Sequence, residues 1–448
     1  MTEPKTCCIV VYGCAKNEAD AEEMALRLES AGYRLTSDMS SADIVVVHTC
    51  GFVEDAKRES IQGILEACQA LEDKASGTGA KRLPVLVTGC LSQRYAQDLI
   101  KEIPEIAGVA GTTAPRDIVQ IVGEALSGKR VVHVGEPGRG APGEGVTRPI
   151  GRPAREWAYI RVSEGCRHRC TYCAIPLMRG PLASRNPDDI VREAEVLSLS
   201  GVKEMNLIAQ DLCDYGHDLA GKTCLPDLVR RLCSVAGIQW IRLLYLRPDG
   251  VSGELASAMA HPKVVPYVDL PVEHGSAKIL RLMGRPGPER ILKAVETLRA
   301  SIPDLHIRTT VIAGFPGEAE KDVEETKALL EAMGAHRVGV FRYSPEEGTP
   351  AYSLPNAVPI EEADERIQEL RKFGLLLARQ SSQSMVGKEI PVLLARPASR
   401  PGYWVGRGPH QAPEVDGWTY VKGAARPGEI ARVRVRRAGT LDLFASVV

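Results

Sequence analysis

Three apolar, strand-like runs near the start of the chain each end in a cysteine and are followed by a helical stretch. The runs are Ile9–Gly13, Ile44–Thr49 and Pro84–Gly89, and the cysteines are Cys14, Cys50 and Cys90. Strands that alternate with helices favour a parallel α/β sheet, in which every strand ends at the same edge. We therefore expect these three cysteines to converge on one pocket, although 36 and 40 residues separate them. Their burial as ordinary strand-end core residues is the alternative.

A second set of three cysteines lies close together in the sequence. Cys166, Cys170 and Cys173 form a CxxxCxxC run directly after another strand-like segment. Four thiolates normally close a structural zinc site or an iron–sulfur cluster, so three leave one metal position open to a ligand that is not protein. Two such open sites indicate an enzyme. The alternative for the second set is a structural zinc site with His168 as the fourth ligand, although we expect His168 to be a solvated loop residue.

The composition is that of a globular protein of two or three domains. The chain has 448 residues, 44% of them hydrophobic and 25% charged, and a formal net charge of -1. This balance gives no overall basic signature for nucleic acid. The N-terminus lacks the pattern of a signal peptide, and no stretch reaches the ~18 apolar residues of a membrane span. We expect a cytoplasmic protein without a membrane partner, in which the twelve cysteines are reduced.

Composition shifts divide the chain into three domains and a linker. We expect an amino-terminal α/β domain at 1–135 and a linker at 136–152, because six glycines and four prolines lie between residues 135 and 155. A second series of strands and helices, 153–380, predicts a partial (β/α)6 barrel. Short β-type runs at 381–448, with ten Lys and Arg against five Asp and Glu, predict a small basic β-barrel of a kind that contacts RNA or ribonucleoprotein. An accessory barrel with an ordinary solvated surface is the alternative.

Hydrophobic periodicity gives the expected elements of these domains. The expected helices of the first domain are 17–30, 56–71 and 92–102. The expected strands of the second are 158–162, 204–209, 240–246, 264–270, 307–313 and 337–342. Its expected helices include 187–198, 225–236, 289–300 and 319–333. In the third, strands are expected at 389–394, 418–421 and 430–435.

The second domain resembles the radical S-adenosylmethionine (SAM) enzymes. The resemblance rests on the CxxxCxxC run, on Tyr172 before its last cysteine, and on the motif TTVIAGFPGE at Thr309–Glu318. It implies a [4Fe-4S] cluster on Cys166, Cys170 and Cys173 that cleaves SAM to a 5′-deoxyadenosyl radical. It also implies a SAM-binding role for Tyr172, Gln210, Asp211, Ile312 and Gly314. Ordinary turn or strand-end residues are the alternative for each of these five.

The first domain is similar to that of the methylthiotransferases, a branch of the same superfamily. The motifs are Gly13–Asn17, Thr49–Phe52 and Gly89–Tyr95. The resemblance implies a second [4Fe-4S] cluster on Cys14, Cys50 and Cys90, a TRAM-like barrel at the carboxyl end, and no catalytic side chain beyond the cluster ligands. One SAM would methylate a sulfur carried by the second cluster, and another would supply the radical. A reductant such as flavodoxin or ferredoxin is an implied partner.

The implied substrate is an aspartate of the small-subunit ribosomal protein numbered twelve, modified at its β-carbon. The features that resemble this branch are Lys16, Ala56–Ser60, Arg242–Leu246 with Pro248–Gly250, and Ala412–Gly417. Glu273 departs from the family, which commonly has glutamine there. Modification of transfer RNA adenosine is the alternative, and a non-catalytic metal-bound protein that binds RNA or the ribosome is a second one.

Overall fold

The amino-terminal part of the chain forms a six-stranded parallel sheet with helices on both faces. The computed structural model describes residues 4–78, 83–138, 155–221 and 224–448. The strand order of the first sheet is β2-β1-β3-β4-β5-β6. Its strands are β1 (Thr6–Val11), β2 (Arg34–Thr36), β3 (Ile44–Thr49), β4 (Val85–Gly89), β5 (Gly108–Ala110) and β6 (Val131–His133). Its helices are α1 (Ala15–Ser30), the short η1 (Met39–Ser41), α2 (Glu54–Thr78), α3 (Cys90–Glu102) and α4 (Ala114–Leu126).

Alternation along β3 explains why this sheet is covered on both sides. Val45 and Val47 pack into a cluster with α2 and α3, whereas Ile44 and Val46 pack into a cluster with α1 and α4. Successive side chains of a strand point to opposite faces, so an uninterrupted apolar run requires a cover on each. All six residues of β3 are buried. This is the parallel α/β domain predicted from the sequence.

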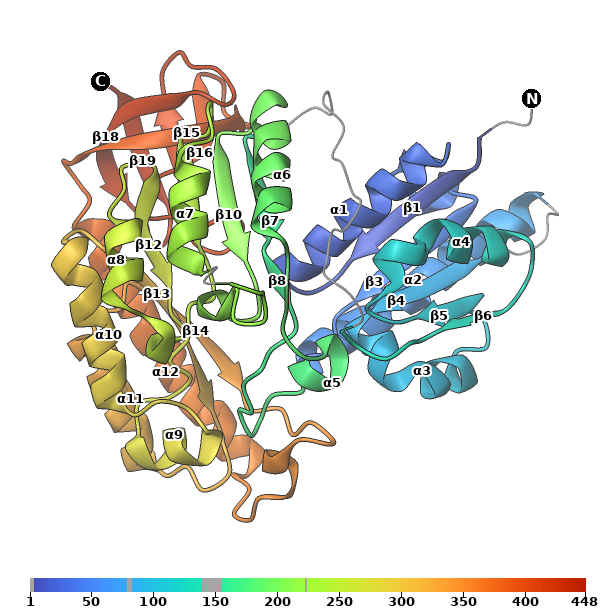
Figure 1. Cartoon of the computed structure of the whole chain (residues 1–448), viewed down its shortest axis with the longest axis horizontal. Coiled ribbons are helices and arrows are strands. Elements are labelled where there is room, and N and C mark those ends of the chain that lie inside the picture. Colours follow the sequence, from blue (N-terminus) through green and yellow to red (C-terminus); the bar gives the residue numbers. More distant parts are fainter. Residues whose placement is uncertain (1–3, 79–82, 139–154, 222–223) are drawn as a thin grey trace.

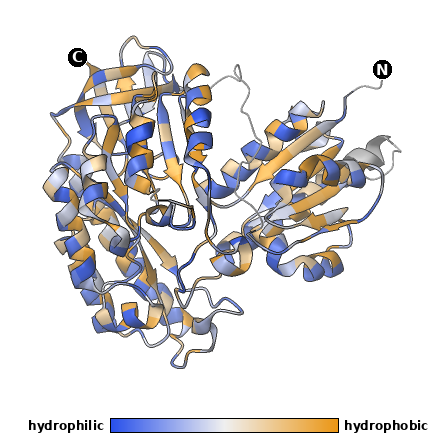
Figure 2. Cartoon of the chain, in the orientation of Figure 1, coloured by the Kyte–Doolittle hydropathy of each residue, from blue (hydrophilic) through white to orange (hydrophobic). Residues whose placement is uncertain are grey.

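A second parallel sheet, in the order β14-β13-β12-β11-β10-β7, forms the centre of the molecule. Its strands are β7 (Trp157–Arg161), β10 (Glu204–Ile208), β11 (Trp240–Leu243), β12 (Val264–Asp269), β13 (His306–Ala313) and β14 (Arg337–Arg342). A two-stranded hairpin consists of β8 (Ser163–Glu164) and β9 (Ala183–Ser184). Because β14 and β7 are not paired, the sheet is open, as the predicted partial barrel requires. Strands of both sheets are largely apolar in Figure 2, and their helices are mixed.

Helices flank the central sheet and join it to the last domain. They are α5 (Ile175–Arg179), α6 (Pro187–Leu199), α7 (Leu225–Cys233), α8 (Gly253–Met259), α9 (Ala277–Met283), α10 (Pro288–Ser301), α11 (Glu320–Ala332) and α12 (Ile360–Gln383), with short η2 (Leu212–Asp214), η3 (Pro248–Gly250) and η4 (Pro350–Ser353). In Figure 1, α5 lies apart from the other helices of this domain, beside the amino-terminal sheet. Within the described residues, no helix combines the length and the apolar character needed to cross a bilayer.

The carboxyl-terminal residues form a closed five-stranded barrel in the order β15-β16-β17-β19-β18. Its strands are β15 (Glu389–Pro397), β16 (Tyr403–Arg407), β17 (Thr419–Lys422), β18 (Ile430–Ala438) and β19 (Leu443–Val447). The predicted small barrel is confirmed, and β16 and β19 are additional to the three strands expected from the sequence. Most of the predicted linker, residues 139–152, lies outside the described residues.

Candidate functional site

Cys14, Cys50 and Cys90 lie at the carboxyl ends of three adjacent strands, and we call them the strand-end site. Cys14 follows β1 and caps α1, Cys50 follows β3, and Cys90 is the first residue of α3 after β4. Burial, together with the nearby thiols of Cys14 and Cys90, raises the pKa of Cys50 to about 12. The three cysteines therefore share one region, as the strand-end pattern of the sequence predicts.

Glycines bring the three turns of the strand-end site together. Gly13 has φ of +111°, and a Cβ atom there would lie 2.7 Å from Cβ of Cys50. At Gly51, a Cβ atom would lie 2.9 Å from the carbonyl carbon of Cys90. Only glycine permits both the backbone conformation of Gly13 and these close approaches. The motif glycines beside Cys14 and Cys50 thus have a steric reason.

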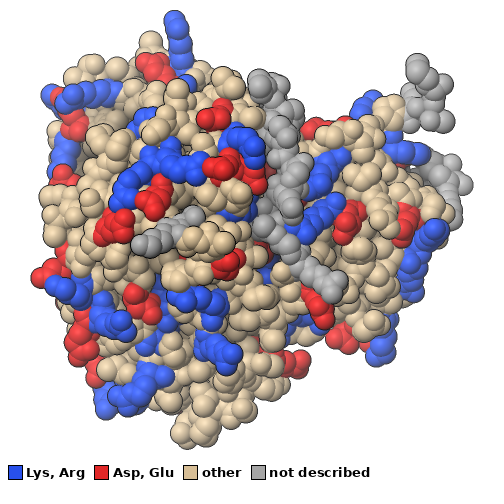
Figure 3. Space-filling model, viewed as in Figure 1, with Lys and Arg blue, Asp and Glu red and all other residues tan. Residues whose placement is uncertain are grey.

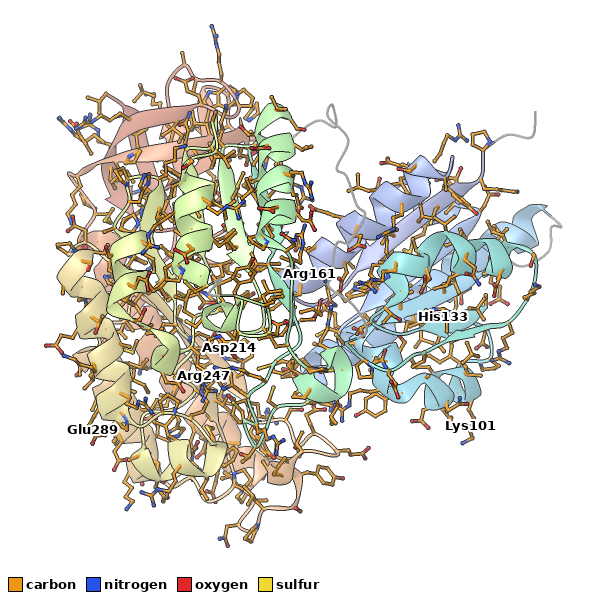
Figure 4. The ribbon with its side chains drawn as sticks, in the orientation of Figure 1. Lys101, His133, Arg161, Asp214, Arg247 and Glu289 are labelled. Carbon is orange, nitrogen blue, oxygen red and sulfur yellow. The ribbon has the colours of Figure 1, made fainter. Side chains whose placement is uncertain are left out.

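Arg179, from α5 of the central domain, donates a hydrogen bond to the strand-end site. Its Nε lies 3.2 Å from Sγ of Cys90, its Nη2 lies 2.8 Å from Oδ1 of Asn17, and its Nη1 lies 2.7 Å from Oδ2 of Asp20. Burial opposes the ionisation of Asp20, but Arg161 and Arg179 outweigh it and hold the pKa of Asp20 well below its usual range. Both arginines are therefore ion-paired across the domain boundary, where Figure 4 shows Arg161.

Cys166, Cys170 and Cys173 lie in the segment between β8 and α5, and we call them the loop site. Each is partly exposed. Sγ of Cys170 accepts hydrogen bonds from Nη1 of Arg247 at 3.0 Å and from Nη1 of Arg285 at 4.0 Å. Burial raises the pKa of Cys166 to about 11 and that of Cys173 well above its usual value, and neighbouring cysteines contribute to both. Thiols this hard to ionise are retained as thiolates when a metal replaces the proton.

His168, inside the loop site, is an ion-paired residue rather than the solvated one expected. Its Nε2 lies 2.9 Å from carboxylate oxygens of both Asp211 and Asp214. Its hydrogen bonds to Asp211 and Asp214 raise its pKa to about 9. A protonated imidazole has no lone pair for a metal, so this arrangement does not favour His168 as a fourth zinc ligand.

Tyr172 and Ile312 lie beside the cysteines of the loop site. They belong to one apolar cluster with Cys170 and Cys173, in which Phe315 is fully buried. Tyr172 is 9% exposed, so its ring is part of this cluster rather than of the surface. The cluster lines the loop site with apolar surface.

Gly314 begins a turn at the end of β13 that a buried carboxylate fixes. The Gly314 amide lies 3.1 Å from each carboxylate oxygen of Glu318, which also accepts hydrogen bonds from His274 at 3.2 Å and from Arg366 at 3.1 Å. Gly314 has φ of +81°, and a Cβ atom there would lie 2.8 Å from Cβ of Ala363. Glycine is therefore needed both for the turn and for the close approach of α12.

Gln210 and Asp211 follow β10 and already have partners in the protein. The amide of Gln210 donates to Glu164, which is also paired with Arg161 and Arg179 near the strand-end site. Asp211 accepts from the amide of Cys213 at 2.9 Å and is paired with His168. Gln210 is thus connected to the junction between the domains, and Asp211 to the loop site.

Glu273, where the family commonly has glutamine, lies close to the loop site. Its backbone has φ of +71°, a conformation that few residues other than glycine adopt. The Tyr172 hydroxyl donates a hydrogen bond to its carboxylate, which lies 3.9 Å from Arg285. Burial raises the pKa of Glu273, against the effect of Arg285 and of this hydrogen bond.

The donor sets fit iron–sulfur clusters better than single ions. Among the residues that the structure describes, two groups are close enough to bind one ion, namely His168–Asp211–Asp214 and Cys224–Asp227–Glu254. Neither contains a cysteine of the two sites. Three thiolates with arginine donors, in an apolar loop site and in a glycine-lined strand-end site, match the ligands of a cluster that keeps one iron open.

The arginines and Glu318 of these sites were not identified from the sequence. Glu318 was within a quoted motif, and its place at the end of GFPGE was an available signal. Arg179, Arg247 and Arg285 lie outside the motifs, and each reaches a thiol or the junction only through the tertiary fold. No local pattern marks them.

Known proteins match the chain over all three domains. Residues 6–111 match the family described as uncharacterized protein family UPF0004, residues 160–330 match the radical SAM superfamily, and residues 386–448 match the TRAM domain. The structure is similar to the radical S-adenosylmethionine methyltransferase TsrM from Kitasatospora setae, with a TM-score of 0.56 and 14% identity over 78% of this chain and 74% of that one. The cobalamin-dependent enzyme OxsB is similar with a TM-score of 0.53 and 14% identity over 83% and 56%. These likenesses establish the fold.

The fold and the loop site define a radical SAM protein with a second three-cysteine site on its amino-terminal domain. A relative from Desulforudis audaxviator, named ribosomal protein uS12 methylthiotransferase RimO, is 43% identical over 98% of this chain and 96% of its own length. A relative of the same name from Thermotoga maritima is 40% identical over 98% and 99%. The chain belongs to this RimO family of radical SAM methylthiotransferases, which confirms the resemblance seen in the sequence.

Proposed function

We propose that the chain inserts a methylthio group at the β-carbon of an aspartate in ribosomal protein uS12. The observation that carries this is the pair of three-cysteine sites whose surroundings meet near Glu164. Glu164 pairs with Arg179 at the strand-end site and accepts from Gln210, and the next residue, Asp211, pairs with His168 in the loop site. Relatives that match nearly the whole chain are named for this activity. Transfer RNA adenosine is the alternative substrate, and the test below separates the two.

The six cysteines would hold two [4Fe-4S] clusters, and Tyr172, Gln210, Asp211, Ile312 and Gly314 would contact SAM. When bound, SAM supplies the radical and the methyl group, and the strand-end cluster would carry an added sulfur. The protein would keep the loop site dry through the apolar cluster around Tyr172 and Phe315. The turn after β13 holds its amide in place through Glu318.

Arginine donors would set the charge balance at both sites. Arg247 and Arg285 donate to Cys170, and Arg179 donates to Cys90. Hydrogen bonds to cluster sulfurs raise the reduction potential, because they stabilise the more negative, reduced state. These three donors all belong to the central domain, although one of them acts on a cysteine of the amino-terminal domain.

The division into domains stays that of the sequence: 1–135, a linker at 136–152, 153–380 and 381–448. The matched family regions, 6–111, 160–330 and 386–448, fall inside the three domains. This support does not fix the boundaries themselves. Limited proteolysis of the protein, followed by mass spectrometry, tests them: the first cut is expected between residues 136 and 152.

Two measurements test the function. After anaerobic reconstitution, we expect about eight iron and eight sulfide per chain, since each cluster contributes four of each. Incubation with SAM, sulfide, a reductant and uS12 should add the mass of a methylthio group to one aspartate of uS12. A modified adenosine in digested transfer RNA, with unmodified uS12, would favour the alternative. Zinc in place of iron would favour the non-catalytic protein.

The barrel would dock the ribosomal partner, and flavodoxin or ferredoxin would supply electrons, in the cytoplasm where ribosomes are found. Exposed arginines of β18 support this docking, but Glu389 already pairs with Arg432 at 2.9 Å and with Arg434 at 2.6 Å. Positive and negative side chains are interspersed on the face shown in Figure 3. Neutralising Arg432, Arg434, Arg436 and Arg437 should weaken binding to ribosomes in a salt-dependent way. Unchanged binding would return these arginines to an ordinary solvated surface.

A further inference from the structure

Lys16 is a cation beside the strand-end site that has no carboxylate partner among the residues the structure describes. It lies in the first turn of α1, two residues after Cys14, and its side chain is partly buried. Its Nζ lies 3.2 Å from the centre of the Tyr245 ring, which belongs to the central domain. In the part of the chain that the structure describes, Lys16 forms no ion pair. The aromatic face offsets only part of the cost of removing an ammonium group from water.

The other cations of this region are already neutralised. Arg308 lies 3.0 Å from Asp269, and Arg179 lies 2.7 Å from Asp20. Arg285 lies 3.9 Å from Glu273. Unlike these three arginines, Lys16 has no ion-pair partner among the described residues, so its charge is available to a ligand.

The surroundings of Lys16 connect the strand-end site to the loop site. Burial lowers the pKa of Lys16, against the effect of the negative charges of Cys14 and Asp269. Asp269 also acts on Glu273, whose carboxylate accepts the hydrogen bond of Tyr172 in the loop site. The backbone of Tyr245 has φ of +63°, an uncommon conformation at the end of β11 that places its ring under the ammonium group. Lys16 thus lies between Cys14 of the strand-end site and Tyr245, which follows β11 at the edge of the central sheet.

We propose that Lys16 binds the carboxylate of the target aspartate. This inference rests on the proposed function, because it names a contact of the same substrate. The β-carbon that receives the methylthio group is bonded directly to the carboxylate carbon. A cation that holds the carboxylate through a charge-assisted hydrogen bond therefore also fixes the reacting carbon between the two sites. It selects aspartate over its neutral isostere, asparagine.

A double-mutant cycle tests the contact. Binding is measured by calorimetry between the reconstituted holoenzyme with SAM and two forms of purified uS12, one natural and one with the target aspartate replaced by asparagine. With the natural enzyme, asparagine should weaken binding on the order of tenfold to a hundredfold, the range for a hydrogen bond between charged groups. Lys16→Met should weaken binding of the aspartate form by the same factor and leave binding of the asparagine form unchanged. Lys16→Arg should restore most of the preference.

The controls separate this contact from a structural role. Lys101 is exposed on α3 and pairs only with the adjacent Glu102 among the described residues, so Lys101→Met should keep the full preference for aspartate. The iron content of Lys16→Met is measured beside binding, and a content equal to that of the natural enzyme shows that both clusters are still bound. If that variant does not load iron, Lys16→Gln takes its place in the cycle.

Two results would overturn the proposal. One is an equal loss of binding for both forms of uS12 on replacing Lys16, which would make Lys16 a support of the strand-end site. The other is no preference for aspartate in the natural enzyme. Failure of the proposed function is a different result, namely that the natural enzyme leaves uS12 unmodified.

Discussion

The two cysteine sites differ in how much of the fold each needs. The loop site draws its three cysteines from eight consecutive residues, and its donors Arg247 and Arg285 belong to the same domain. The strand-end site draws its cysteines from the ends of three strands and its donor Arg179 from another domain. Formation of the first depends on one domain, whereas formation of the second depends on a folded sheet and on its docking against α5.

The short helix α5 contacts both sites, because it follows the last cysteine of the loop site and carries the arginine that donates to Cys90. It begins two residues after Cys173 and ends at Arg179, whose side chain is 2% exposed. The segment that completes the loop site therefore also delivers the hydrogen bond to Cys90. Arg179 lies six residues after Cys173, so one short segment contacts both sites.

The largest effect should come from removing one ligand of each site. We expect Cys166→Ala to abolish SAM cleavage, because the loop site then has two thiolates and cannot hold a cluster that presents an open iron. Cys50→Ala should retain uncoupled SAM cleavage but give no methylthiolated uS12. Chromatography of 5′-deoxyadenosine and mass spectrometry of uS12 measure the two outcomes. Full product formation by Cys50→Ala would show that the strand-end site is not part of the reaction.

Removing Arg179 should show how strongly the strand-end site depends on its docking against α5. Arg179→Met leaves Asp20 with fewer cationic partners and Cys90 without its donor, and the loss of a buried ion-paired arginine costs on the order of 3 kcal/mol. We expect lower iron content at the strand-end site and a lower midpoint of thermal unfolding.

Arg247→Met is the matched comparison, because it removes the donor to Cys170 within one domain. It should shift the potential of the loop-site cluster while iron at the strand-end site stays bound. The electron paramagnetic resonance signals of variants with Cys50→Ala or Cys166→Ala separate the two clusters. Equal loss of iron from both sites in both arginine variants would show that the two sites do not differ in their dependence on domain docking.

The features that could be predicted from the sequence are those that local residue patterns determine, such as strands and the direction of a sheet. Uninterrupted apolar runs such as Ile44–Thr49 placed both the parallel sheet and the cysteines at its edge, because strand period and sheet direction are local consequences of residue type. The three domains and the open central sheet followed from the same reasoning. The contacts of Arg179 could not be predicted, since they join residues 159 and 89 positions apart. The expectation of a solvated His168 was wrong because its partners Asp211 and Asp214 come from the next strand–loop unit.

Raising the pH should remove the contribution of His168 to the stability of the loop site. The pKa of His168 is raised to about 9 by Asp211 and Asp214, above its unfolded value of about 6.5. The protonated form is favoured by folding, so its contribution is complete below pH 6.5 and is lost as the pH rises through 9. Compared with His168→Gln, the natural protein should be more stable by about 1–3 kcal/mol at pH 6 and by much less at pH 10. Urea unfolding at the two pH values measures this, and an advantage that does not change with pH would refute it.

The smallest effect should come from a carboxyl pair one turn beyond Cys14, between α1 and the barrel. Burial, and a hydrogen bond shared with Glu414, raise the pKa of Glu18 to about 8. Folding therefore favours the protonated acid, and this contribution is complete below the unfolded pKa of about 4.3 and lost as the pH rises through 8. Since Glu18 is 30% exposed, solvent reduces the effect to on the order of 1 kcal/mol. Glu18→Gln keeps the hydrogen bond without the charge, so it should stabilise the protein at pH 8.5 and change nothing at pH 4. If Glu18→Gln were neutral at both pH values, the amino-terminal domain and the barrel would not be coupled through this pair.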